Sequence, residues 1–254
     1  MKLTIKNIFI TLAWKFEEFL GFNSNIKVVL CYHGFSENNS KYNVSPEKFE
    51  KTITALSRKF KFVNLDTLST KNKGNYISLT IDDGYKSVLK ISEIIKKHKI
   101  PVTLFVMSDT NKIDRKELGN TDTLLSISDI NKLKNEGWTI GNHSATHSNL
   151  IKLDKKTLDK EVKKSQQKLK EGFKTNIDYF AYPKGLFNNK IKDALKKTGY
   201  KKALTVRPDY VTSNSNSFEI PRFVMEKEDI FGPMPYAFSK TAQVLRNIKY
   251  YYAN

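Results

Sequence analysis

The sequence predicts an α/β fold in which helices cover a mostly parallel sheet. From residue 27 onward, short runs rich in β-branched residues alternate with longer segments of helical periodicity, which is the pattern of repeated βα units. The chain has 254 residues, of which 39% are hydrophobic, so one domain of this length can bury a full core. We see no internal repeat, low-complexity tract or Pro- or Gly-rich linker that would mark a second domain.

Six segments are predicted to be strands, and five segments between them are predicted to be helices. Ser45 stands before Pro46, and Asp154 stands before the fourth helix, so both are expected to cap a helix start. Ser126 and Asp129 have the spacing of a capping box. The predicted strands are 27–32, 76–81, 102–107, 138–141, 177–181 and 201–206. The predicted helices are 46–60, 87–99, 127–136, 155–171 and 190–198.

Residues 1–25 are predicted to form an amphipathic helical extension. Its apolar side chains recur at three- and four-residue spacing, so they share one face of a helix. That face can lie on a membrane surface, or it can pack on the protein's own body or on a second subunit. The apolar residues are Ile5, Ile8, Phe9, Leu12, Phe16, Phe19 and Leu20.

The apolar run from Ile8 to Trp14 does not have the features of a cleavable signal peptide. It is short, charged residues follow it at once, and no small-residue cleavage site appears. No stretch reaches the ~18 to 20 apolar residues of a transmembrane helix. A cytoplasmic or membrane-peripheral location is therefore expected rather than secretion.

The chain is strongly basic, with a formal net charge of +18. Only five of its 44 basic residues are arginines, and lysine point charges suit solvated surfaces better than bidentate recognition, so we expect no nucleic-acid partner. The charge can still favour an anionic membrane face or a phosphate-bearing glycan carrier. The single cysteine excludes any intrachain disulfide framework and says little about the compartment.

Two adjacent carboxylates, Asp82 and Asp83, follow the predicted strand 76–81. The carboxyl ends of parallel strands are where active sites lie in βα architectures. Because the two residues are neighbours, their side chains must diverge, so one can bind a cation while the other faces a substrate or water. An Asp-Asp-Gly sequence on its own is usually only a turn.

Two of the four histidines, His143 and His147, follow the predicted strand 138–141. Histidines four residues apart share one face of a helical turn, so both imidazoles can reach one metal ion. With one carboxylate they make three protein ligands and leave positions for water, as in catalytic sites. Zinc suits this donor set, and nickel, cobalt or iron also fit. Alone, the spacing is often a coincidence.

Two further segments follow predicted strands. Pro183 restricts Tyr182 to an extended conformation, so the Tyr182 N–H can point into a cleft, although an ordinary turn is the alternative. His33 lies at the carboxyl end of the first strand, level with the other candidates. It is either catalytic or a packed histidine at a strand end.

Residues 80–85, 143–147 and 182–185, in that order, resemble the three signature segments of the polysaccharide deacetylase (NodB-homology) family of carbohydrate esterases. The resemblance covers roughly residues 28 to 224. It implies a distorted (β/α) barrel and an enzyme that uses a metal to remove N-acetyl groups from the amino sugars of a polysaccharide or glycan. The reaction is hydrolysis of a carbon–nitrogen bond other than a peptide bond.

The resemblance also assigns roles and boundaries. Asp83, His143 and His147 would be the metal ligands, and Asp82 would be the general base. The Tyr182 N–H would join the metal in an oxyanion hole. The catalytic domain would occupy 26–230, followed by a C-terminal extension over 231–254.

Two positions depart from the family pattern. Many members carry an arginine near the third segment that steadies the base, and here Arg222 is expected to supply that charge from elsewhere in the chain. Many members also have a C-terminal histidine as general acid, but no histidine follows His147. His33 is the expected replacement, because poly-N-acetylglucosamine deacetylases have a rearranged motif order with the acid in the first strand-loop segment.

Several functions stay open at this point. Hydrolysis would use Asp82 as proton acceptor and His33 as donor to the departing sugar nitrogen. The substrate can be a polymer such as poly-N-acetylglucosamine or peptidoglycan, or a lipid- or nucleotide-linked sugar. Two histidines and a carboxylate can also hold Fe(II) for oxygen chemistry. A catalytically impaired glycan-binding relative, or a basic glycan- or nucleic-acid-binding module, is the non-enzymatic alternative. The sequence does not choose an oligomeric state.

Overall fold

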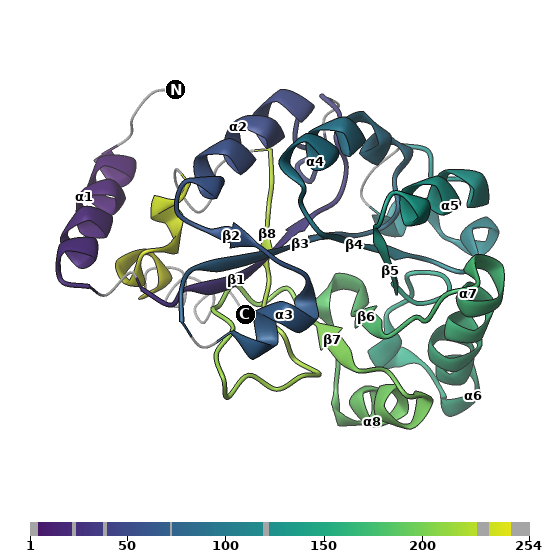
Figure 1. Ribbon diagram of the computed structural model, residues 1–254. Helices are drawn as coiled ribbons and strands as arrows, with labels where there is room; N and C mark the ends of the chain where they lie inside the picture. The colour runs from purple at the N-terminus through teal and green to yellow at the C-terminus, as the bar shows by residue number, and fades with distance from the viewer. Residues whose placement is uncertain are drawn as a thin grey trace.

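A single curled sheet forms the centre of the described part of the molecule, and helices surround its outer side (Figure 1). Its eight strands include seven in the order β7-β6-β5-β4-β3-β1-β8, with β2 paired to β3, and every pairing between them is parallel. This is the predicted α/β class, with the sheet curved as part of a (β/α) barrel. The computed structural model describes residues 5–21, 24–37, 40–71, 73–118, 122–227 and 234–244.

All six predicted strands are present, each within two residues of its predicted ends. The sequence analysis missed β2 and β8, because a two-residue pairing has no periodicity to recognise. The strands are β1 (Lys27–Tyr32), β2 (Lys61–Phe62), β3 (Tyr76–Ile81), β4 (Val102–Val106), β5 (Thr139–Asn142), β6 (Tyr179–Ala181), β7 (Lys202–Leu204) and β8 (Phe223–Val224).

The predicted helices are also present, and their caps form as expected. Ser45 and Asp154 accept backbone N–H bonds at their helix starts, and Ser126 and Asp129 make a capping box. The predicted helix 155–171 is interrupted by a π-turn, η5 (Lys160–Lys164), and the predicted helix 87–99 begins with a 3-10 turn, η1 (Lys86–Ile91). The helices are α1 (Ile5–Phe19), α2 (Pro46–Ser57), α3 (Leu65–Thr70), α4 (Ser92–His98), α5 (Ile127–Asn135), α6 (Lys155–Asp159), α7 (Ser165–Phe173) and α8 (Asn189–Thr198).

Both faces of the sheet are buried. In β1, Val28 and Leu30 enter the large cluster beneath the outer helices, while Val29 enters a smaller cluster on the other face with Phe105 of β4. All five residues of β4 are buried. The strands therefore read as continuous apolar runs, as expected for a parallel sheet covered on both sides.

The N-terminal helix α1 packs with the face opposite to its predicted apolar stripe. Trp14 is buried with its ring edge-on to Tyr236, and Glu17 accepts the backbone N–H groups of Lys240 and Thr241 at 2.8 Å. The stripe itself is exposed, so its packing on the described body of this chain is excluded. Its exposed members are Ile8, Phe9, Leu12, Phe16, Phe19 and Leu20, and the side chain of Ile5 lies outside the described part.

The C-terminal extension predicted over 231–254 is described only between residues 234 and 244. There Phe238 is fully buried against Phe60 and Phe223, so this segment packs on the body. Over the described residues, no helix has the length and apolar character that crossing a membrane requires.

We expect Gly141→Ala to destabilise the fold by about 1–3 kcal/mol, because overpacking a rigid core costs this much. A Cβ at residue 141 would lie 2.5 Å from ring atoms of Phe105, which is fully buried. The matched control is Gly172→Ala in α7, where a Cβ meets no atom within 4 Å and should stabilise the helix by up to about 1 kcal/mol. Urea unfolding measures both, and shifts of the same sign would contradict the expectation.

Candidate active site

The loops that follow β1, β3, β5 and β6 meet at the carboxyl edge of the sheet, where they line a cavity of about 450 Å³. Pockets for small ligands have volumes of roughly 300–1,000 Å³. Six of the seven site residues expected from the sequence line this cavity, and the seventh, Arg222, is buried and bound to Asp82. The six are His33, Asp82, Asp83, His143, His147 and Tyr182.

Asp83, His143 and His147 form a compact cluster of buried metal-ligand types. His143 Nε2 lies 3.3 Å and His147 Nε2 lies 3.6 Å from Asp83 Oδ1. One ligand atom from each residue lies within 4.8 Å of the others. Asp83 Oδ1 and His147 Nδ1 are buried with no hydrogen-bond partner among the described residues. His143 Nδ1 lies 2.8 Å from the Ala181 carbonyl oxygen, which orients the ring with Nε2 toward Asp83. The donor set therefore fits a divalent metal ion.

The electrostatics of the cluster favour ligation. Burial raises the pKa of Asp83, but the close approach of the His143 ring and the other nearby imidazoles outweigh burial and lower it. Burial lowers the pKa of His147 to about 4, and the neighbouring His143 adds to this effect. At pH 7, Asp83 is therefore ionised and His147 is neutral, which are the states that bind a metal. Burial lowers the pKa of His143, but the charge of Asp82 and contacts with Asp83 raise it, so this histidine must be neutral before it can ligate.

A loop brings the two histidines together, and the predicted helical turn was wrong. Residues 143–149 follow β5 without helical structure, and Ser144 and His147 have φ of +68° and +61°. Asp83 also has a positive φ of +68°. The His147 N–H donates to Ser144 Oγ at 3.0 Å, which closes the turn. Left-handed backbone at non-glycine residues is strained, and such strain gathers at functional sites.

Asp82 and Arg222 form a buried bidentate ion pair. Arg222 Nη1 donates to Asp82 Oδ1 and Nη2 donates to Oδ2, both at 2.7 Å. Two further donors are also used, because Nε donates to the Thr205 carbonyl at 2.8 Å and Nη1 also reaches Thr80 Oγ1 at 3.2 Å. The charge of Arg222 outweighs burial and holds the pKa of Asp82 well below its usual range. The structure thus brings Arg222 to the carboxylate to which the sequence analysis had assigned it.

His33 lies beside Asp82 at the edge of the cavity. Its ring packs on Tyr42, with 5.0 Å between ring centroids, and burial lowers its pKa although Asp83 and Asp82 oppose this. Single ligand-type atoms of Cys31, His33 and Asp82 lie within 4.8 Å of one another. Burial raises the pKa of the Cys31 thiol, which therefore donates to Asp82 Oδ2 at 3.4 Å rather than acting as a thiolate ligand.

The prediction for the Tyr182 amide was wrong. Its N–H donates to the Leu204 carbonyl at 3.1 Å, because this residue continues the hydrogen-bonding ladder between β6 and β7. Tyr182 still lines the cavity, and its hydroxyl donates to the Phe218 carbonyl at 2.9 Å. Lys184, two residues later, also lines the cavity and has a φ of +59°.

Sequence reasoning missed several residues of the cavity. Tyr42 and Lys116 come from irregular or short segments that give no periodic signal. Cys31 does not line the cavity but contacts Asp82, and in the sequence it is indistinguishable from the other buried residues of β1. Only Lys184 could have been found, because it lies inside the third signature segment.

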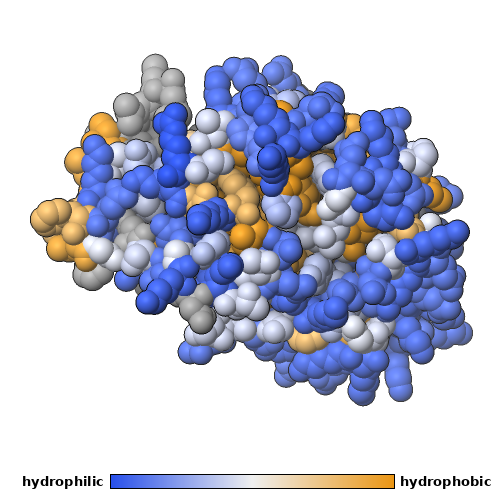
Figure 2. Space-filling model, viewed as in Figure 1, coloured by the Kyte–Doolittle hydropathy of each residue, from blue (hydrophilic) through white to orange (hydrophobic). Residues whose placement is uncertain are grey.

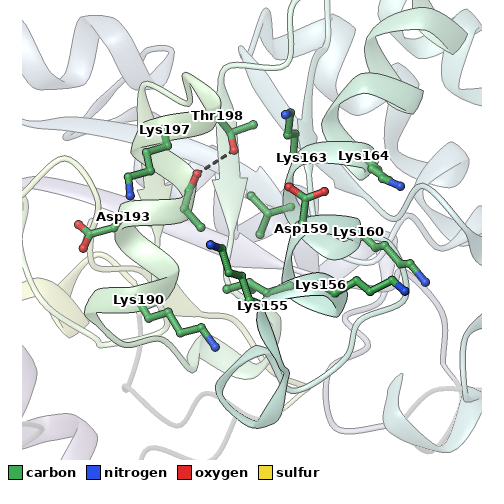
Figure 3. Close-up of a pocket in the computed structure, with 13 residues that line it drawn as sticks. Lys155, Lys156, Asp159, Lys160, Lys163, Lys164, Lys190, Asp193, Lys197 and Thr198 are labelled. Atoms are coloured by element: carbon green, nitrogen blue, oxygen red, sulfur yellow. Dashed lines mark hydrogen bonds between the residues drawn. The ribbon is translucent and has the colours of Figure 1, made fainter.

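A wider groove of about 890 Å³ lies between the segment α6–η5 and α8, and it shares no residue with the cavity (Figure 3). Lysine side chains dominate its lining, and it contains no cluster of metal-ligand types within the described residues. The smaller cavity is therefore the candidate active site. The charged residues of the lysine groove are Lys155, Lys156, Asp159, Lys160, Lys163, Lys164, Lys190, Asp193 and Lys197.

We expect Arg222→Met to lower the free energy of unfolding by about 3–5 kcal/mol, because it leaves the Asp82 carboxylate buried and unpaired. The matched control is Lys51→Met, which breaks the exposed pair with Glu47 and should cost less than about 1 kcal/mol. Urea denaturation of both variants measures the difference. If the two variants unfolded alike, the buried pair would not support the fold.

Comparison with known proteins identifies one family over the part of the chain that carries most of these residues. The model of the polysaccharide deacetylase family matches residues 69–203, which include Asp82, Asp83, His143 and His147 but not His33. A poly-β-1,6-N-acetyl-D-glucosamine N-deacetylase of Staphylococcus aureus is 30% identical over 217 residues, which span 78% of this chain and 73% of the relative. The enzyme of the same name from Staphylococcus epidermidis is 25% identical over 209 residues, spanning 76% and 71%.

Solved structures share the fold. The Streptococcus pyogenes deacetylase PplD, in complex with acetate, superposes with a TM-score of 0.69 at 18% identity and covers 80% of this chain and 93% of its own. IcaB from Ammonifex degensii gives a TM-score of 0.67 at 22% identity and covers 86% and 96%. These likenesses confirm the distorted (β/α) barrel expected from the sequence. With the family match and the staphylococcal relatives, they lead to one conclusion: this chain belongs to the polysaccharide deacetylase family.

Proposed function

We propose that this chain is a metal-dependent N-deacetylase that acts on poly-β-1,6-N-acetylglucosamine or a closely related amino-sugar polymer. The observation that carries the proposal is the juxtaposition, in one cavity, of the Asp83–His143–His147 cluster and the carboxylate of Asp82. The names of the staphylococcal relatives support the choice of substrate. A lipid- or nucleotide-linked sugar is the alternative substrate, and a glycan-binding protein without activity is the alternative function.

Asp83, His143 and His147 would hold the metal ion, most suitably zinc, with nickel, cobalt or iron also compatible with two imidazoles and a carboxylate. When bound, such an ion polarises a carbonyl oxygen and lowers the pKa of a coordinated water from 15.7 to about 7. The protein supplies the ligand geometry through buried side chains whose rings are already oriented.

Asp82 is the proposed proton acceptor. Its Oδ2 lies 3.9 Å from His143 Nε2, so the carboxylate borders the ligand cluster. Arg222 keeps Asp82 ionised at neutral pH, which makes it available as a base. The same ion pair also weakens the carboxylate as a proton acceptor, so a proton that it takes is readily passed on.

His33 is the proposed proton donor to the departing amine. One of its ring nitrogens lies within 4.8 Å of an Asp82 carboxylate oxygen, so the proposed proton donor lies beside the proposed acceptor. Because burial lowers the pKa of His33, its protonated form is a stronger acid than an exposed imidazolium. An amide nitrogen is a poor leaving group, so this acidity assists cleavage of the carbon–nitrogen bond.

We expect Asp82→Asn and His33→Ala to lower acetate release from acetylated poly-β-1,6-N-acetylglucosamine by at least about 100-fold, the usual size of a general acid or base effect. The matched controls are Asp159→Asn in the lysine groove and His98→Ala on α4, which should keep wild-type rates. Circular dichroism verifies that each variant is folded.

The same assay separates the alternatives. Chelator should abolish acetate release, and added zinc should restore it. Acetate release without oxygen would exclude the non-haem iron alternative. A folded, zinc-loaded wild type that released acetate from none of the polymers, peptidoglycan fragments or lipid- and nucleotide-linked sugars would overturn the enzymatic proposal. An Asp82→Asn rate within tenfold of wild type would overturn the base assignment alone.

We also propose that the exposed stripe of α1 rests on an anionic membrane surface. Phe16 and Phe19 are 64% and 86% exposed, and Figure 2 shows apolar side chains gathered over α1. The buried contacts of Trp14 and Glu17 hold the helix with this stripe facing outward. A net charge of +18 attracts anionic lipids, whereas two copies of so basic a chain repel each other.

We expect the triple variant Leu12→Ser, Phe16→Ser and Phe19→Ser to lose at least tenfold in affinity for phosphatidylglycerol vesicles, measured by sedimentation at low salt. Ile127→Ser removes an apolar side chain that is 68% exposed on α5 and should bind like the wild type. Equal binding of the wild type to phosphatidylcholine vesicles, or a dimer in solution that the triple variant lacks, would contradict the membrane proposal.

A further inference from the structure

The loop that carries His143 and His147 is held by a buried glutamate on a neighbouring helical segment. Glu161 Oε2 accepts the backbone N–H groups of Ala145 at 2.9 Å and Thr146 at 3.0 Å, and Oε1 accepts the Thr146 hydroxyl at 2.8 Å. The carboxylate is only 5% exposed. All three donors belong to residues between the two histidines in the sequence. One side chain therefore holds the loop segment that separates His143 from His147.

Within the described part of the chain, Glu161 has no lysine, arginine or histidine as an ion-pair partner. Burying an ionised carboxylate is costly unless hydrogen bonds replace its water. Here two adjacent backbone N–H groups and a hydroxyl supply those bonds, and bonds to an ionised acceptor are roughly twice as strong as neutral ones. The hydrogen bonds from this loop, rather than an ion pair, therefore satisfy the Glu161 carboxylate in the described part of the chain.

Glu161 lies in a π-turn of its helix. In η5 (Lys160–Lys164) the backbone N–H of Ser165 donates to the carbonyl of Lys160, five residues earlier. Glu161 and Val162 are both buried, while the lysines of the same turn line the open lysine groove (Figure 3). Single π-turns inside helices occur frequently at functional sites.

The loop needs external support because its own backbone is strained. Ser144 and His147 both have left-handed φ values, and each such non-glycine residue costs roughly 1–3 kcal/mol. The bonds from Glu161 fall on the two residues between them. A second contact secures the start of the loop, since Ser165 Oγ donates to Asn142 Oδ1 at 3.0 Å. The segment η5–α7 thus braces the loop at two points.

We propose that Glu161 is a positioning residue for the metal site: it fixes the separation of His143 and His147 and so raises the affinity for a divalent ion that it does not touch. This inference rests on the proposed metal site. Residues that orient metal ligands typically contribute 10- to 100-fold in metal affinity. Because Glu161 acts through the loop, its loss should weaken binding without removing any ligand.

The test is zinc affinity, measured by competition with a chromophoric chelator, together with the visible spectrum of the cobalt-substituted protein. Glu161→Ala should bind zinc about 10- to 100-fold more weakly and show an altered cobalt spectrum. Glu161→Gln keeps an oxygen for the two N–H groups and should restore affinity to within about threefold. Gln166→Ala is the matched control, because Gln166 is buried on the same helix but donates to the Ile177 carbonyl at 2.7 Å.

The outcomes separate this inference from the proposed function. Equal zinc affinity in the wild type and in Glu161→Ala would overturn the positioning role alone. A loss in Gln166→Ala as large as that in Glu161→Ala would also overturn it, since general destabilisation would then explain the effect. A wild type that bound no zinc would overturn both. If Glu161→Ala does not fold, Thr146→Val removes the third contact, and unchanged zinc affinity in that variant would count against the inference.

Discussion

The buried pair of Asp82 and Arg222 is the interaction on which the rest of the site depends. Two charges removed from water are tolerated only if their geometry is good and their remaining donors are satisfied. The protein meets this condition by bringing together residues 140 positions apart: β8 pairs with β1, and Thr205 and Thr80 accept two further guanidinium hydrogens. The short strand β8 thus makes a stable ionised carboxylate possible at the carboxyl end of β3.

Much of this arrangement is predictable from the sequence, because local chemistry determines it. Strand positions follow from apolar runs, and the carboxyl ends of parallel strands must share an edge, which placed the aspartates and histidines together. The assignment of Arg222 came from the family resemblance, in which an arginine steadies the base aspartate. The helical turn for the histidines and the free Tyr182 amide failed, because loop conformation and the continuation of a ladder depend on neighbours distant in sequence.

The role of Glu161 could not be predicted from the sequence. In the sequence it is one of several charged residues in an amphipathic segment, and periodicity would place it no differently from a solvated glutamate. Only the π-turn distinguishes it, and the turn becomes visible only when the helix packs against the loop after β5. Some residues of the site are positioned directly by the strands that they follow. Others, such as Glu161, act by holding the backbone of a neighbouring loop. Sequence patterns reveal mainly the first kind.

Lys116 and Lys184 place positive charge at the cavity, and this charge affects the product of the proposed reaction. Each acetyl group removed turns a neutral amide into an amine, which is partly protonated at neutral pH, so the polymer becomes steadily more cationic. A chain of net charge +18 repels such a polymer more strongly with every turnover. Under the proposed function, the enzyme's own surface limits how densely one polymer strand is deacetylated before the two part.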